Sequence, residues 1–283
     1  MSPSDNHEAA VSGADDTIAQ FEDTRTGLVG RIQNRLHQTP SLVPLIVLLF
    51  SVILFGILLG SRFFSPFALT LILQQVQIVG VLAAAQTLII LTAGIDLSVG
   101  AIAVLCTVVM GKATFSYGIP PAISVAIGIT VGTALGAISG WLVSRMKLPP
   151  FIVTLGMWQI VLAANYLYSS NETIRSQDIE AEASFLQFLG TKLQFGGATF
   201  TLGVLLMIVL FIGLAYALRS TAWGRHVYAV GDDPEAAQLS GGDVHKTYMS
   251  VYMAAGCICG LAGWVMIGRF GAISPSATTG VIG

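Results

Sequence analysis

Asp96 is the only acidic residue between positions 40 and 171, and it lies in the stretch Gly94-Ile95-Asp96-Leu97-Ser98-Val99-Gly100. Gly94 is expected to end one helix and Asp96 to cap the next, which leaves backbone N–H groups free to face a solute. A carboxylate between apolar runs is costly unless it is capped, paired or hydrated. Two interpretations stay open: Asp96 caps a turn at a membrane edge, or the stretch is a broken helix that lines a solute pathway.

Uncharged amides inside apolar runs are a second candidate for solute binding. Gln75 and Gln86 are about three helical turns apart and share one face of a helix, and Asn165 lies in a later run. Amides donate and accept hydrogen bonds without carrying charge, which suits a path for hydroxylated solutes. The alternative is that they hydrogen-bond neighbouring helices within a membrane.

Enzymatic and metal chemistry have no support in the sequence. The four histidines are scattered, and no pair has the spacing of metal ligands. Cys257 and Cys259 fit neither a zinc knuckle nor a redox motif, and Gly111-Lys112-Ala113 lacks the other residues of a phosphate-binding loop. We expect no catalytic residue, no metal, no ATP site and no nucleic-acid surface on this chain.

The elements that would position these groups are strongly apolar. The 283 residues are 54% hydrophobic and only 10% charged, against about 25% charged in soluble domains, so the chain is expected to lie in a membrane. The sequence predicts an all-α, polytopic bundle of about seven spans, with a broken or re-entrant segment at 92–100. The expected spans are 42–60, 68–91, 99 to beyond 110, 122–143, 151–168, 200–218 and 248–268.

Basic residues predict the orientation. Residues 1–40 are polar and acid-rich, and arginines in this tail precede the first span, so we expect a disordered cytoplasmic tail. Residues 41–283 form the transmembrane domain. With the start inside, successive spans place Arg145 and Lys147 inside, the loop 169–197 outside and the loop 219–247 inside, which satisfies the positive-inside rule.

The loop 219–247 is expected to carry a short helix at Asp233-Pro234-Glu235-Ala236-Ala237. Asp233 is expected to accept from free backbone N–H groups, and Pro234 suits the first helical position. Gly241-Gly242 are able to take the left-handed conformation that ends a helix. Such a helix, with a flat alanine face outside the membrane, either completes a loop or fits a groove on a partner.

Glycines recur at every fourth position of the span 122–143, and two more lie in the span 248–268. Without a Cβ they permit close approach of helix backbones in lipid. We expect packing within one subunit or across a dimer. The residues are Gly128, Gly132, Gly136, Gly140, Gly256 and Gly260.

Two motifs resemble those of a known transporter family. Glu235-Ala236-Ala237, followed after three residues by Gly241, matches the EAA-x-x-x-G motif of ABC importer membrane subunits. Leu91–Gly100 resembles the L-T-x-G-I-D-L-S-V-G hallmark of ribose-type sugar permeases, with Ala93 where Ser or Gly is common. The resemblance runs from about 42 to 280, and the flank 222–234 looks most like that of fructose-type permeases.

The resemblance implies a permease subunit of an ATP-driven monosaccharide importer in the bacterial inner membrane. It also implies that the helix 234–240, through Asp233 to Ala237 and Gly241, couples to a separate ABC ATPase subunit that binds ATP and Mg²⁺. An extracytoplasmic sugar-binding protein would deliver the solute, and a second permease copy would complete a homodimer surrounded by lipid. ATP-driven closure would push the helix and switch the side that the pathway faces.

Two other functions are weighed against this one. A stand-alone secondary transporter or channel should carry buried charges for ion coupling, and the spans are nearly free of them. A membrane-embedded enzyme should show clustered catalytic side chains, and none is visible. Family members usually continue beyond 278–280, so we expect a truncated chain that does not support uptake alone.

Overall fold

The structure is a computed structural model that describes residues 39, 42–195 and 197–277. The predicted tail 1–40 therefore lies outside the described residues, except for Thr39. The chain divides into two units, 1–63 and 64–283, which are described separately.

The described part of the first unit is one apolar helix and a turn. Helix α3 (Leu42–Leu59) contains no charged residue, and none of its residues is buried. The short 3-10 helix η1 (Gly60–Arg62) follows, with Gly60 at a positive φ of 56°. The rings of Phe55 and Phe63 stack with their centroids 6.1 Å apart.

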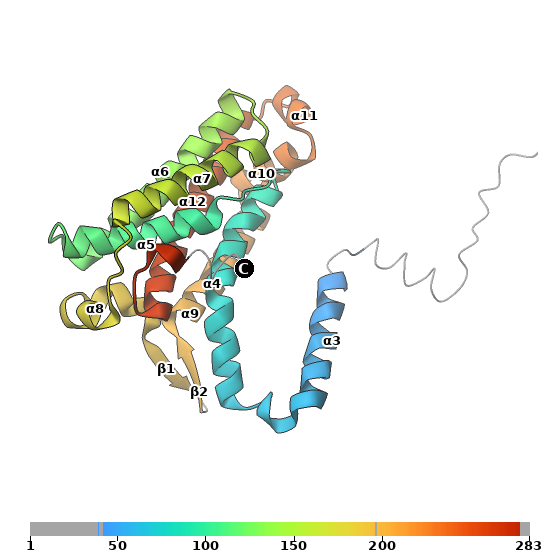
Figure 1. Ribbon diagram of the computed structural model, residues 1–283. Coiled ribbons are helices and arrows are strands. Elements are labelled where there is room, and N and C mark those ends of the chain that lie inside the picture. Colours follow the sequence, from blue (N-terminus) through green and yellow to red (C-terminus); the bar gives the residue numbers. More distant parts are fainter. Residues whose placement is uncertain (1–38, 40–41, 196, 278–283) are drawn as a thin grey trace, which may run out of the picture. The chain divides into compact units, whose positions relative to one another are not determined.

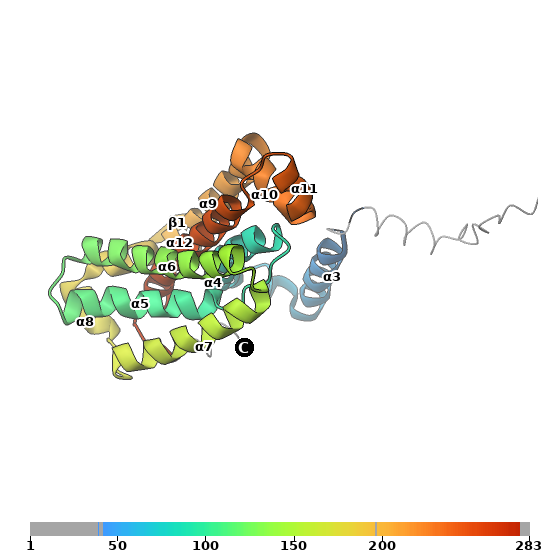
Figure 2. The same ribbon diagram turned by 90° about the horizontal axis from the view of Figure 1, so that it is seen from above.

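The second unit is a helical bundle with a small hairpin (Figures 1 and 2). Its elements are α4 (Pro66–Ile90), α5 (Val99–Phe115), α6 (Pro121–Arg145), α7 (Pro150–Ser169), α8 (Ser176–Glu182), η2 (Ser184–Gly190), β1 (Lys192–Phe195), β2 (Ala198–Thr201), α9 (Leu202–Ser220), α10 (Ala222–Asp232), α11 (Pro234–Leu239), α12 (Val244–Phe270) and η3 (Pro275–Ala277). Prolines at the first positions of α4, α6, α7 and α11 fit the place where a missing N–H costs nothing.

Helix α12 is the centre of this unit. It contacts α4, α5 and α6, and 67% of its most apolar window is buried, against 11% for α9. Helix α9 therefore leaves most of its apolar surface outward, where lipid solvates it. In Figure 2, α5, α6 and α7 lie side by side, and of these three α5 and α6 contact α12.

The glycines of α6 form its contact with its neighbours. All four are buried. A Cβ on Gly132 or Gly136 would overlap the backbone of α12 at Gly256 and Tyr252, and a Cβ on Gly128 would meet Met110 of α5. Gly140 faces Met249 and Tyr252 in the same way. The close approach therefore occurs within one subunit.

Six helices are long and apolar enough to cross a membrane among the described residues, and α5 is a shorter apolar helix. Together they correspond to the seven predicted spans, and the break before α5 lies within 92–100 as expected. The all-α polytopic fold is confirmed.

The connection 169–197 was predicted only as a polar loop, but it is folded, and its second strand runs on to Thr201. Ile179 of α8 and Leu186 and Leu189 of η2 are buried, and β1 pairs antiparallel with β2. Thr70 of α4 accepts from the backbone N–H of Thr199 at 2.8 Å. Buried leucines spaced three apart in η2 cover the end of α12, so this segment belongs to the core.

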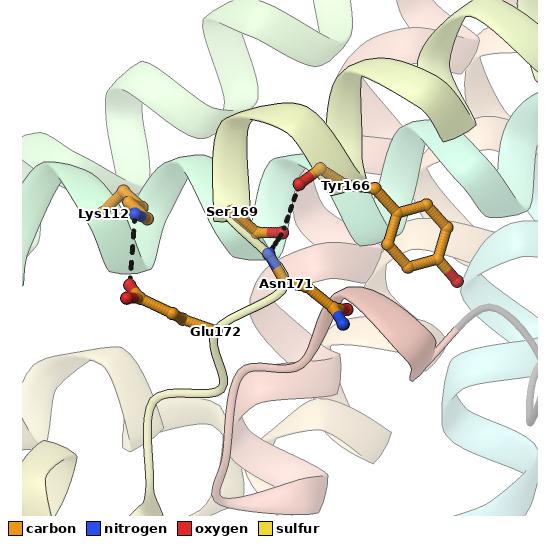
Figure 3. Close-up of polar contacts among 5 residues, drawn as sticks. All are labelled: Lys112, Tyr166, Ser169, Asn171 and Glu172. Carbon is orange, nitrogen blue, oxygen red and sulfur yellow. Dashed lines mark hydrogen bonds and ion pairs between the residues drawn. The ribbon is translucent and has the colours of Figure 1, made fainter.

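Polar contacts fix the turn that leaves α7 (Figure 3). Ser169 donates to the carbonyl of Tyr166 at 3.2 Å and accepts from the N–H of Asn171 at 3.0 Å. The turn brings Glu172 to Lys112 of α5, with the two charged atoms 3.5 Å apart. The loop that begins here is thus tied to the end of α5.

Candidate functional site

Helix α11 starts as the sequence predicts. Asp233 is its N-cap, and Oδ1 accepts from the N–H groups of Glu235 at 2.9 Å and Ala236 at 3.0 Å. Pro234 occupies the first helical position. One carboxylate thus satisfies two of the free donors at this helix end.

The end of α11 is set by one glycine. Gly241 has a φ of 85°, and the N–H of Gly242 bonds to the carbonyl of Ala237 at 2.9 Å. Of the two glycines proposed for this role, only Gly241 is left-handed, because the pattern needs one such residue. Ala237 is the buried residue of α11, while Leu239 is 90% exposed. The helix therefore presents Glu235, Ala236 and Leu239 outward.

Helix α10, which was not predicted from the sequence, supports α11. Val227 and Val230 are buried on one side, and the side chain of Thr221 accepts from the N–H of Gly224 at 3.2 Å. A hollow of about 240 Å³ between α10 and α11 is lined by residues that include His226 and Ala236. Apolar residues three positions apart, at 227 and 230, were the signal that could have revealed this helix.

The same end of the unit joins α6 to α12. Arg145 donates from Nε to Nε2 of His245 at 3.2 Å, and Nδ1 of His245 lies 2.6 Å from Oγ of Ser144. Asp243 caps α12 by accepting from the N–H of Lys246 at 3.0 Å and pairs with its ammonium at 2.9 Å. These bonds to Lys246 lower the pKa of the Asp243 carboxyl.

The break between α4 and α5 is a helix end of the Schellman type. The N–H of Gly94 bonds to the carbonyl of Ile89 at 3.0 Å, and that of Ala93 to Ile90 at 2.9 Å. The left-handed residue is Ala93, with a φ of 57°, so the expectation that Gly94 ends the helix is wrong by one position. Gly94 instead lies close to Ile89 and the Tyr252 hydroxyl, where a Cβ would be crowded.

Replacing Ala93 with glycine should stabilise the protein by about 1 kcal/mol, because a left-handed backbone strains a residue that has a Cβ. The thermal unfolding midpoint in detergent should rise. Ala126, which is exposed in the second turn of α6, is the matched control, since glycine there should lower stability by about 1 kcal/mol. Equal losses for both variants would contradict the assignment.

Asp96 lies in the irregular segment before α5 and is 7% exposed. Its Oδ1 accepts from the backbone N–H of Ser98 at 2.7 Å and from its hydroxyl at 2.6 Å. Ser98, rather than Asp96, is the N-cap residue of α5. Asp96 therefore stabilises the turn that leads into the helix, as an Asx turn does.

Thr154 of α7 holds this segment from a distant part of the chain. Its hydroxyl donates to the carbonyl of Ile95 at 3.1 Å and accepts from the N–H of Leu97 at 3.2 Å. The side chain is fully buried. Sequence reasoning missed this residue, since a threonine in an apolar helix carries no signal of a partner more than fifty positions away.

A pocket of about 320 Å³ brings two of the predicted groups together. It lies between α4 and α5, and its lining residues are Val79, Leu82, Ala83, Gln86, Asp96, Leu97, Val99 and Gly100. Gln86 Oε1 is buried without a hydrogen-bond partner among the described residues, which costs about 1–3 kcal/mol if nothing else binds it.

Gln75 and Asn165 lie elsewhere. Gln75 shares the face of α4 that carries Gln86, but it is exposed and does not line the pocket. Asn165 is buried and donates from Nδ2 to the carbonyl of Pro275 at 2.9 Å. Its amide therefore ties α7 to η3, which is the packing alternative foreseen for these amides.

The irregular segment also contacts the end of α10. A Cβ on Gly231 would overlap the backbone of Leu91 and crowd that of Thr92, so the two backbones approach closely. The segment that carries Asp96 and the helices α10 and α11 are therefore neighbours at one end of the unit (Figure 1).

A family model described as the branched-chain amino acid transport system / permease component matches residues 68–282. The chain belongs to this family. The matched region of this permease begins in the first turn of α4 and extends beyond η3, so it contains almost all the described residues of the second unit.

Relatives that are named as sugar import permeases support the same assignment. The permease is 58% identical over 275 residues to the fructose import permease of Rhizobium meliloti. The aligned residues are 97% of this chain and 76% of that protein. It is 31% identical over 245 residues to the ribose import permease of Escherichia coli K12, or 87% of this chain and 74% of that protein. No solved structure matches the chain.

These findings confirm the family resemblance and the multi-pass permease fold. The permease is of the ABC importer type, located in the membrane. The family description names amino acids, whereas the relatives above are named for sugars, so the solute is a separate question.

Proposed function

We propose that this permease is the transmembrane subunit of a bacterial ABC importer for a monosaccharide of the fructose or ribose type. The identity of 58% to a fructose import permease over nearly the whole chain supports a sugar as the solute. The inner membrane is the expected location, with the tail 1–40 and the loop 219–247 on the cytoplasmic side.

The observation that carries the coupling role is the geometry of α11. A six-residue helix capped by Asp233 and ended by Gly241 presents Glu235 and Ala236 to the exterior. A short, rigid, exposed helix suits insertion into a groove on another protein, because little order has to be gained on binding. We assign that groove to a separate ATPase subunit, which would bind ATP and Mg²⁺ and carry out hydrolysis.

The remaining partners follow from the same proposal. A second copy of the permease would complete the pathway, and an extracytoplasmic sugar-binding protein would deliver the solute at the end opposite α11. Helix α12 spans the unit from Val244, next to α11, to Phe270, next to η2. A displacement of α11 would therefore reach the delivery end through one continuous helix.

Deleting the gene from its own bacterium should lower the uptake of labelled fructose or ribose by intact cells, and the restored gene should recover it. Competition by unlabelled fructose, ribose, xylose, galactose and branched-chain amino acids identifies the solute. Loss of amino acid uptake, with sugar uptake unchanged, would overturn the sugar assignment.

The tagged permease in mild detergent should also retain an ATPase subunit that mass spectrometry identifies by its nucleotide-binding motifs.

A further inference from the structure

The pocket between α4 and α5 contains polar atoms with unused hydrogen-bonding capacity. Oδ1 of Asp96 accepts both bonds from Ser98, and Oδ2 has no partner among the described residues. Gln86 faces the same pocket, and its Oε1 is buried without a partner in the described part of the chain. Buried polar groups in folded proteins are nearly always paired, so the Gln86 oxygen requires an explanation.

The two groups are held in place. The Asp96 carboxylate is fixed by the turn to Ser98, and the residues on both sides of it, Ile95 and Leu97, are bonded to the Thr154 hydroxyl. Gln86 lies in the regular part of α4. A site whose groups are already oriented binds a ligand without a large ordering cost.

The chemistry of the pocket matches a neutral solute with several hydroxyl groups. The carboxylate accepts hydrogen bonds, and the amide of Gln86 both donates and accepts them. The other side chains of the lining are apolar, as is usual where a few polar groups orient a small ligand. We propose that this pocket binds the transported monosaccharide through Asp96 and Gln86, with Thr154 as a positioning residue.

A bound cation is the competing occupant, and the lining favours the sugar. Asp96 is the only charged residue among the eight that line the pocket, and the described residues hold no group of three His, Cys, Asp or Glu suited to a metal. A hard cation needs six or more oxygen ligands, whereas these two side chains offer few.

The location gives the site a mechanical connection to α10. Gly231 of α10 lies against the backbone of Leu91 and Thr92, a few residues before Asp96. Movement of α10 and α11 would therefore shift the segment that carries the carboxylate. The inference rests on the proposed function for its solute, but the pocket and its unused acceptors do not depend on it.

Binding of labelled fructose and ribose to the purified full chain in lipid nanodiscs, measured by scintillation proximity, tests the site. Gln86→Leu and Asp96→Asn should weaken binding by about tenfold, since each loses a hydrogen bond to the sugar. Asparagine retains an oxygen for the Ser98 turn, so this variant keeps the local fold. Gln75→Leu, on the same face of α4 but outside the pocket, is the matched control and should bind as the parent does.

The positioning role of Thr154 is tested by replacing it with valine, which lacks the hydroxyl, and with serine, which keeps it. Thr154→Val should weaken sugar binding and Thr154→Ser should restore it, while both variants keep the unfolding midpoint of the parent within a few degrees.

Equal binding by the parent, Gln86→Leu and Asp96→Asn would overturn the proposal, as would binding of Na⁺ without any sugar. Co-purification of the ATPase, measured on the same samples, reports on the proposed function separately.

Discussion

Glu235→Lys combined with Ala236→Leu should release the ATPase subunit from the permease. The two side chains are exposed on a short helix whose start and end are fixed by Asp233 and Gly241. Reversed charge and added bulk at the centre of an interface typically cost 2 kcal/mol or more, or about 30-fold in affinity. Pull-down of the tagged permease, followed by quantitative mass spectrometry, measures the retained ATPase.

The matched control is Glu182→Lys, which makes the same charge change at an exposed position of α8. Its ATPase content should equal that of the parent. Both permease variants should show the parent's unfolding midpoint, because none of the three replaced side chains is buried. An unchanged ATPase content in the Glu235 and Ala236 variant would refute the coupling role of α11.

Gly136→Leu should prevent α6 from packing against α12. A Cβ at this position already overlaps the backbone of Tyr252, and backbone atoms cannot yield as a flexible side chain does. Overpacking of a close contact costs about 3 kcal/mol, and α12 is the centre of the unit. We expect loss of the monodisperse peak in detergent size-exclusion chromatography and a clear fall in the unfolding midpoint.

Gly213→Leu in α9 is the control, since no atom lies within 4 Å of a Cβ at this position. It adds the same side chain to a face that lipid solvates, and leucine favours a helix over glycine. Its monodisperse peak should match that of the parent, and its unfolding midpoint should equal or exceed the parent's. If Gly136→Leu behaved in the same way, the close approach of α6 and α12 would be wrong.

Local signals in the sequence predicted much of this structure. The apolar runs predicted the long helices, because length and hydropathy alone decide a span. Asp233 followed by Pro234 predicted the start of α11, and a glycine after the helix predicted its end, since both devices act within a few residues. The break at 92–100 was predicted for the same reason, although Ala93 takes the left-handed position.

Contacts between distant parts of the chain were not predictable. Gln86 and Asp96 line one pocket only because the segment after α4 folds back onto the end of that helix, and Thr154 bonds to Ile95 from another helix. The buried leucines of η2 were hidden in a connection that reads as polar. Gln75 and Gln86 share a helical face, but their surroundings differ, and periodicity does not report what covers a face.

The row of glycines in α6 also limits how this protein is able to move. Where two antiparallel helices touch through their backbones, no side chain lies between them whose rotamer change could absorb a displacement. Helices α6 and α12 should therefore travel as one rigid body during a transport cycle. The dihedral angles that change should therefore belong to the segments at their ends, which include 146–149 after α6 and 240–243 before α12, beside the start of α7 and α11.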